Sequence, residues 1–150
     1  MNSNFGDVRN MALTRRKMLL LGSATFTTAA FMGLPAFAGL ADDAIMAITG
    51  GAEMGAEGIT LTAPEIAENG NTVPVEVSAP GAVSIALFAS GNPTPAVATF
   101  NFGPLAGSQT GATRIRLAKT QDVVAIATMA DGSFRRAAAT VKVTIGGCGG

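Results

Sequence analysis

The sequence predicts an all-β domain, a sandwich of two sheets built from about seven strands. From residue 59 onward, apolar and polar residues alternate over short segments, which is typical of half-buried strands. Gly, Pro, Asn and Asp separate these segments and favour turns. We expect strands at 59–63, 72–78, 82–89, 96–102, 112–118, 122–130 and 134–145.

Residues 1–38 are expected to be an export signal that is cleaved from the mature protein. Arg15 and Arg16 form a twin-arginine pair, an apolar run covers 18–34, and "AFA" at 36–38 fits a cleavage site. A transmembrane anchor is the alternative, but the run is short, contains Gly, Ser and Thr, and ends in a proline. We therefore expect a periplasmic protein, exported by the twin-arginine pathway.

Composition restricts both the size and the chemistry of the mature chain. Removing 38 of 150 residues leaves 112, enough for one small domain. Six basic and nine acidic residues remain, and this net charge of −3 argues against nucleic acid or an anionic membrane as the main partner. With no histidine and one cysteine, neither a Ser-His triad nor the usual zinc and copper sites can form. We expect no catalytic residue, metal or cofactor.

A short amphipathic helix is expected at 40–49, ahead of the strands. Leu40, Ala44, Ile45 and Ile48 lie on one stripe at helical spacing, and two glycines follow that can end the helix. We expect this helix to cover an open edge or end of the domain. The segment after it, 51–58, has the composition of a loop.

Alternation along the strands predicts which side chains face the core. Val73, Val75 and Val77 should point inward, with Pro74 and Glu76 pointing outward. Pro74 cannot donate to a sheet, which makes its strand an edge or a bulged strand.

The strand expected at 112–118 follows the same rule. Ile115 and Leu117 should face the core, and Arg114 and Arg116 should face water. Together with "RR" at 135–136 these arginines could attract an anion, although a solvated strand face is the simpler interpretation.

The last strand should be anchored up to Ile145, since Val141, Val143 and Ile145 alternate with Lys142 and Thr144. Between strands, "ADG" at 130–132 suits a hairpin turn and "NPTP" at 92–95 suits a rigid loop.

The chain ends in "GGCGG", which places its only cysteine, Cys148, between glycine pairs. Glycine leaves the backbone least restricted, so Gly146, Gly147, Gly149 and Gly150 favour a thin, flexible arm. Three extended residues carry the thiol about 10 Å beyond the last strand, far enough to enter a cleft on another protein.

No basic side chain flanks Cys148 to favour the reactive thiolate, so a partner enzyme must activate it. The protein is then a carrier and not an enzyme. The alternative is an exported interaction module that uses Cys148 only for an intermolecular disulfide. Ubiquitin-like sulfur carriers also end in Gly-Gly, but they depend on ATP, which the periplasm lacks.

The chain resembles the SoxY family, the sulfur-carrier subunits of the Sox thiosulfate-oxidising system. The resemblance lies in the twin-arginine leader, "PEIAENGNTVPVEV" at 64–77, "NPTPAVATF" at 92–100, "TRIRLAKTQDVVAIA" at 113–127 and the terminal "GGCGG". It implies an immunoglobulin-like sandwich that pairs with a SoxZ-like subunit.

The resemblance also implies that Cys148 is the covalent attachment site for thiosulfate-derived sulfur. The transient partners would be the haem enzyme SoxAX, the hydrolase SoxB and, where present, SoxCD. The expected division of the chain is a leader, a helix with its loop, the sandwich and a carrier arm, at 1–38, 39–58, 59–145 and 146–150.

Overall fold

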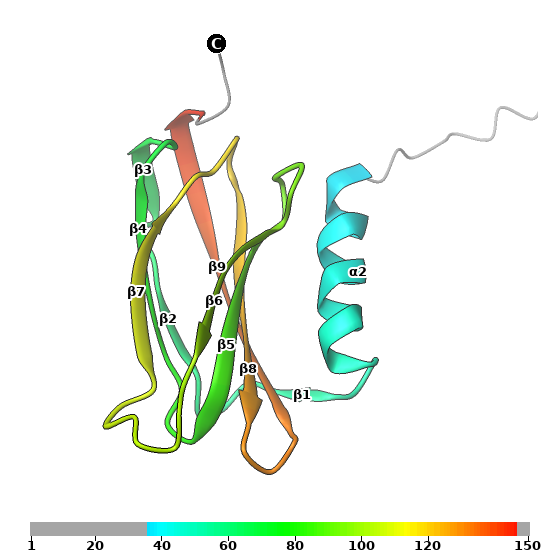
Figure 1. Ribbon diagram of the computed structural model, residues 1–150. Helices are drawn as coiled ribbons and strands as arrows, with labels where there is room; N and C mark the ends of the chain where they lie inside the picture. The colour runs from blue at the N-terminus through cyan, green and yellow to red at the C-terminus, as the bar shows by residue number, and fades with distance from the viewer. Residues whose placement is uncertain (1–35, 147–150) are drawn as a thin grey trace, which may run out of the picture. The chain divides into compact units, whose positions relative to one another are not determined.

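The computed structural model describes residues 36–146, with side chains from Gly39 onward. In this part of the chain one helix precedes nine strands (Figure 1). The elements are α2 (Ala36–Thr49), β1 (Met54–Gly55), β2 (Thr60–Thr62), β3 (Ile66–Asn69), β4 (Val73–Ser78), β5 (Ala82–Ala89), β6 (Ala96–Asn101), β7 (Thr110–Ile115), β8 (Gln121–Met129) and β9 (Phe134–Ile145).

The strands form the two layers of a sandwich. The larger sheet has the order β1-β9-β8-β5-β6, with β3 also paired to β9, and the smaller sheet has the order β2-β4-β7. The row β9-β8-β5-β6 matches strands G, F, C and C′ of an immunoglobulin domain, and β2, β4 and β7 match A, B and E. The predicted immunoglobulin-like sandwich is therefore confirmed.

All seven predicted strands are present, with ends within three residues of the expected positions. β5 and β9 have the predicted bounds. The strand expected at 112–118 ends earlier, at Ile115. The prediction missed β1 and β3, since each is only two to four residues long and pairs in parallel with β9, far along the chain.

The main core lies between the two sheets. Val73, Val75 and Val77 are buried while Pro74 and Glu76 are exposed, as predicted. The largest completely buried side chains include Ile85, Leu87, Leu117, Val123 and Val141.

Strands β5 and β8 are buried on both faces, so they do not alternate. The residues of β5 that point away from the main core, Ala86 and Phe88, pack with Val124 and Ile126 of β8 and with Ile45 of α2. Helix α2 therefore covers the outer face of the larger sheet (Figure 1). The expectation that it covers an edge or end is wrong, because this face carries apolar residues that need a cover.

The buried stripe of α2 is rotated from the predicted one. Ala41, Ile45 and Thr49, four residues apart, face the sheet, whereas Leu40 and Ile48 are 44% and 43% exposed. The hydroxyl of Thr49 donates to the carbonyl oxygen of Ile45 (3.1 Å), so a polar residue tolerates burial there. Two glycines with positive φ, 62° and 81°, end the helix as predicted.

β4 lies in the middle of the smaller sheet, so the prediction of an edge strand is wrong. β2 pairs with β4 only as far as Thr62, opposite Glu76. At Pro74, β4 has a neighbour on one side only, Arg114 of β7. A missing N–H is tolerated at such a position.

The predicted turn at 130–132 closes the hairpin between β8 and β9. Gly132 has φ 82°, and the backbone bonds across the turn join Met129 to Ser133 (2.9 Å) and Gly132 to Met129 (3.0 Å). The hydroxyl of Ser133 donates to Asp131 (2.6 Å), and this bond, with that from the Ser133 N–H, lowers the pKa of the Asp131 carboxyl.

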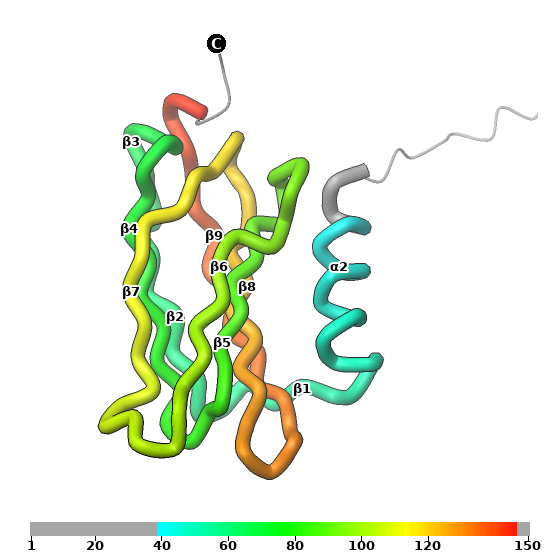
Figure 2. Tube along the Cα trace, viewed as in Figure 1, coloured from blue at the N-terminus to red at the C-terminus, as the bar shows by residue number. Residues whose placement is uncertain are grey.

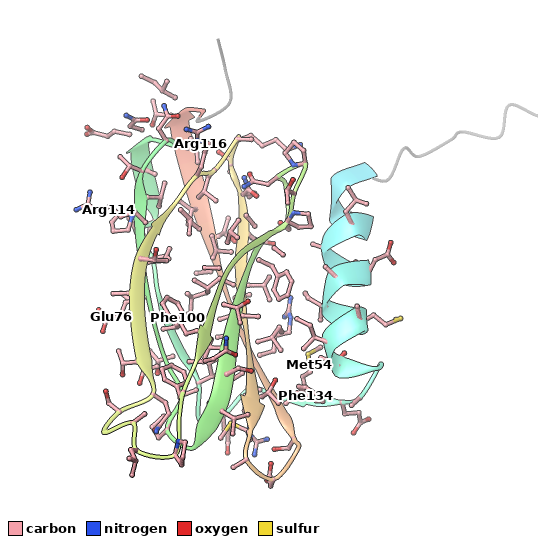
Figure 3. The ribbon with its side chains drawn as sticks, viewed as in Figure 1. Met54, Glu76, Phe100, Arg114, Arg116 and Phe134 are labelled. Atoms are coloured by element: carbon pink, nitrogen blue, oxygen red, sulfur yellow. The ribbon has the colours of Figure 1, made fainter. Side chains whose placement is uncertain are left out.

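An aromatic ring closes the side of the sandwich where β6 and β7 face each other. The ring of Phe100 packs so closely on the backbone of Gly111 that a Cβ there would lie 2.7 Å from its atoms. Figure 3 shows Phe100 reaching toward the space between the sheets. Glycine at position 111 is thus required by packing.

We expect Gly111→Ala to destabilise the fold by about 1–3 kcal/mol, because the added methyl must displace the Phe100 ring. The control is Gly103→Ala, since a Cβ on Gly103 meets no atom within 4 Å. Denaturant unfolding of both variants is the measurement. Equal midpoints for the two variants would contradict the packing argument.

Candidate functional site

The end of β9, at Ile145, is where the C-terminal "GGCGG" begins. Strand β3 runs parallel to the last residues of β9. It pairs Ala67 with Val143 and Asn69 with Ile145. Figure 2 traces β3 alongside the end of β9. The N–H of Gly70 then donates to the carbonyl oxygen of Ile145 at 2.7 Å, which fixes the backbone at the last residue of the strand.

Backbone pairing, and not side-chain burial, holds this end of the strand. Val141 is completely buried and Val143 is half-buried, but the side chain of Ile145 is 66% exposed. The predicted inward orientation is correct for Val141 and wrong for Ile145. The strand has run past the core at this point, so its hydrogen bonds to β3 and Gly70 are what remains to hold it.

Gly146 is half-buried and packs against the loop between β7 and β8. A Cβ on Gly146 would overlap the carbonyl oxygen of Ala118 and lie 3.3 Å from its carbonyl carbon. The obstacle is backbone, which cannot rotate out of the way as a long side chain can. Glycine at position 146 is therefore required by packing, in addition to any freedom it provides.

The side chain of Asn92 holds the backbone of that loop. Its Oδ1 accepts from the N–H of Ala118 (3.0 Å), and its Nδ2 donates to the carbonyl oxygen of Arg116 (2.7 Å). Between these two residues, the N–H of Leu117 donates to the carbonyl oxygen of Gly70 (2.7 Å). Each residue from 116 to 118 thus has a backbone group bonded to a fixed partner.

Gln121 supports Asn92 from the start of β8. Its Nε2 donates to Oδ1 of Asn92 (2.9 Å) and to the carbonyl oxygen of Lys119 (3.1 Å), and its Oε1 accepts from the N–H of Gly91 (2.7 Å). Both amide side chains are only 7% exposed. Leaving such a group without a partner costs about 1–3 kcal/mol. No buried side-chain nitrogen or oxygen lacks a partner in the part of the chain described.

Two further bonds join β9 to this loop and to the start of β8. The hydroxyl of Thr120 accepts from the N–H of Val143 (3.0 Å), and the hydroxyl of Thr140 donates to the carboxylate of Asp122 (2.6 Å). The loop between β7 and β8 and the last third of β9 therefore form one hydrogen-bonded unit.

The residues predicted to carry the chemistry lie outside the described part of the chain. This applies to Cys148, to its neighbours Gly147, Gly149 and Gly150, and to the export pair at 15–16. Of the predicted carrier arm, only Gly146 lies within it.

The four arginines considered as an anion site do not form one patch. Arg114 and Arg116 are exposed at the end of β7, close to the end of the sandwich where β3 lies (Figure 3). Arg135 and Arg136 are at the start of β9, beside β1. Strand β3 pairs with the other end of β9, so the two pairs of arginines lie far apart. The simpler interpretation, a solvated strand face, fits Arg114, Arg116 and Arg136, which are exposed, whereas Arg135 is half-buried beside Gly55 of β1.

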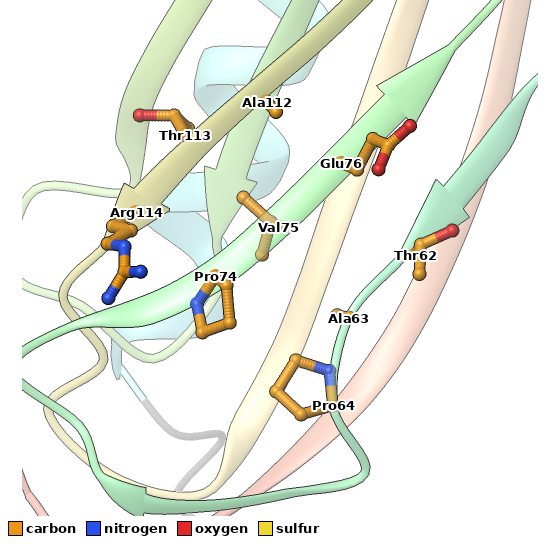
Figure 4. A pocket seen from close by; sticks show the side chains of 9 residues that line it. All are labelled: Thr62, Ala63, Pro64, Pro74, Val75, Glu76, Ala112, Thr113 and Arg114. Atoms are coloured by element: carbon orange, nitrogen blue, oxygen red, sulfur yellow. The ribbon is translucent and has the colours of Figure 1, made fainter.

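A shallow groove of about 560 Å³ lies on the outer face of the smaller sheet (Figure 4). Prolines 64 and 74 and alanines 63 and 112 give it apolar walls, and Glu76 and Arg114 bring opposite charges. A second hollow of about 280 Å³ lies under α2, beside Met46, Met54 and Arg136.

The described residues contain no group of three or more His, Cys, Asp or Glu side chains placed to hold a metal ion. Within the same residues, no helix combines the length and the apolar character needed to cross a membrane.

Sequence reasoning missed Asn92 and Gln121 as parts of this site. "NPTP" correctly indicated a loop, the one between β5 and β6, but the prediction gave no partner to the asparagine. Gln121, an uncharged polar residue two positions before the apolar run of β8, was the available signal, because buried amides occur where backbone groups need partners. Which groups those were depended on the folding of distant segments.

The fold and the end of β9 define an immunoglobulin-like domain whose last strand leads into a glycine-flanked cysteine. The family model described as "Sulfur oxidation protein SoxY" matches residues 45–148. The chain belongs to the SoxY family.

Solved structures agree with this assignment. The sulfur carrier protein SoxY from Chlorobium limicola f thiosulfatophilum is 39% identical, with a TM-score of 0.63, over 72% of this chain and 96% of that one. A superoxide reductase (neelaredoxin) from Ignicoccus hospitalis is 21% identical, with a TM-score of 0.51, over 57% and 79% of the two chains, and shares the fold alone. No curated protein matches the sequence.

Proposed function

We propose that the protein is a covalent carrier of sulfur substrates in thiosulfate oxidation, and that Cys148 is the attachment site. One observation carries the proposal: the SoxY family match extends through residue 148 and so includes the only cysteine of the chain. The structural relative of 39% identity is itself described as a sulfur carrier protein. The thiol follows two residues after Gly146, which packs against the sandwich.

The first step would join thiosulfate to the thiol by oxidation. The Cys148 thiol and thiosulfate form a new S–S bond to the sulfane sulfur, giving Cys–S–S–SO₃⁻, one proton and two electrons. The electrons pass to the haem enzyme SoxAX, which serves as the oxidant.

The second step would remove the sulfonate by hydrolysis. Water attacks the terminal sulfur, the S–S bond to the sulfonate breaks, and the products are sulfate, a proton and the persulfide Cys–S–SH. SoxB would catalyse this step, and SoxCD, in hosts that have it, would oxidise the remaining sulfane sulfur. The protein holds the intermediates and its partners do the catalysis.

The carrier role requires partners that the sandwich can bind. A SoxZ-like subunit would form the heterodimer, and the enzymes would bind transiently, each taking Cys148 into its active site. The absence of a basic residue beside Cys148 supports a division of labour in which each enzyme activates the thiol.

Intact-mass analysis of the protein from thiosulfate-grown cells should show sulfur adducts on the C-terminal peptide that a thiol reductant removes. Cys148→Ser should abolish the adducts and thiosulfate oxidation without affecting stability, because position 148 follows the last strand. Free thiol and disulfide-linked dimer alone would instead support an interaction module. Substantial turnover by the serine variant would show that the sulfur is carried elsewhere.

Gly147→Val should impair loading without changing the intrinsic reactivity of the thiol. The β-branched side chain narrows the backbone choices and thickens the segment that enters an enzyme cleft, while the charge stays the same. Small thiol reagents should label Cys148 at nearly the wild-type rate, and turnover by the reconstituted enzymes should fall sharply. Normal turnover would mean that a thin arm is not required.

We place the mature protein in the periplasm on the basis of Arg15, Arg16 and the "AFA" site. Replacing both arginines by Lys should retain the precursor in the cytoplasm, together with any SoxZ-like subunit that is exported with it. Cell fractionation is the measurement. Recovery of the variant in the periplasm at wild-type levels would rule out twin-arginine export.

A further inference from the structure

The first glycine of "GGCGG" differs from a free hinge in one respect. Gly146 packs on the carbonyl group of Ala118, and a side chain at position 146 would collide with that backbone. The preceding residue, Ile145, is hydrogen-bonded to Gly70 at 2.7 Å. The backbone at Ile145 and Gly146 therefore has a defined position, set by Gly70 and by the loop between β7 and β8.

The position of the Ala118 carbonyl depends on two side chains. Asn92 bonds to the backbone on both sides of Leu117, at Arg116 (2.7 Å) and Ala118 (3.0 Å). Gln121 in turn bonds to Asn92 (2.9 Å) and keeps its amide oriented. A buried polar network with every member paired favours one geometry over its alternatives.

We propose that Asn92 and Gln121 are positioning residues. They fix the position of Gly146, the first residue of the carrier arm, which we call the root of the arm. This inference rests on the proposed carrier function of Cys148. Two extended residues span about 7 Å from Gly146 to Cys148. A displacement of the root by even one or two ångströms is large on that scale, and every enzyme that docks on the sandwich must find the thiol within this reach.

The alternative is that the two amides only stabilise the loop between β7 and β8. A stabilising role predicts a lower unfolding midpoint and nothing else. A positioning role predicts that the location of residue 148 relative to the sandwich changes while the domain is still folded. The two interpretations therefore differ in a geometric measurement that requires no enzyme.

The test uses the full protein purified from its host, with a nitroxide on Cys148 and a second on Glu76→Cys, an exposed position of the central strand β4. Double electron–electron resonance gives the distance distribution between them. We expect Asn92→Ala to broaden and shift it by a few ångströms. Gly146→Ala, which keeps the network but adds the colliding methyl, should do the same, and a wild-type distribution in this variant overturns the inference even if Asn92→Ala fails to fold.

Loading by the partner enzymes is measured on the same variants with residue 76 unchanged. We expect kcat/KM to fall on the order of tenfold to a hundredfold, as misplacements of about 1 Å can produce. The rate of labelling by a small thiol reagent should stay at the wild-type value. Gly111→Ala is the matched control, because it destabilises the domain at the far end of β7 and should change neither the distances nor the loading.

A wild-type distance distribution, or wild-type loading, in folded Asn92→Ala and Gly146→Ala would overturn the inference. Failure of the carrier function gives a different result. In that case the wild-type protein carries no sulfur on Cys148, while the distance measurement, which needs no loading, still reports whether the two amides position the root.

Discussion

The carbonyl oxygen of Ala118 occupies the space that a side chain at position 146 would need. This contact sets the position of Gly146, the first residue of the C-terminal "GGCGG". It depends on Asn92, which bonds to the loop between β7 and β8 on both sides of Leu117, and on the short parallel strand β3, which pairs with the end of β9. Three segments that are distant in the sequence thus set the surroundings of Gly146: β3, the loop that carries Asn92, and the loop between β7 and β8.

The rest of the sandwich provides a rigid base for this junction. β9 pairs with β8 along most of its length, and β5 and β8 are covered on one face by the smaller sheet and on the other by α2. Strands buried in this way open only when the domain unfolds. Because β9 is paired with the buried β8, its end keeps a constant position, as the carrier function proposed above requires.

Sequence patterns predicted most of the fold because alternation reports burial directly. Val73, Val75 and Val77 face the core as predicted, and the bounds of β5 and β9 were correct. The errors occur where tertiary contacts override the local pattern. The side chains of β5 do not alternate between buried and exposed, because α2 covers their outer face. The side chain of Ile145 is exposed because β9 extends beyond the core. β3 escaped prediction because its partner lies about 75 residues away.

By itself the sequence determined the sandwich, the family and the single thiol, Cys148, since strand periodicity, motif order and cysteine count are local properties of the chain. Only the tertiary structure decided the setting of Gly146. The partners of Asn92 and Gln121 lie up to thirty residues away, and the atom that excludes a side chain at position 146 belongs to Ala118. Such contacts exist only after the two sheets have packed, because no local pattern encodes which backbone carbonyl a distant glycine will meet.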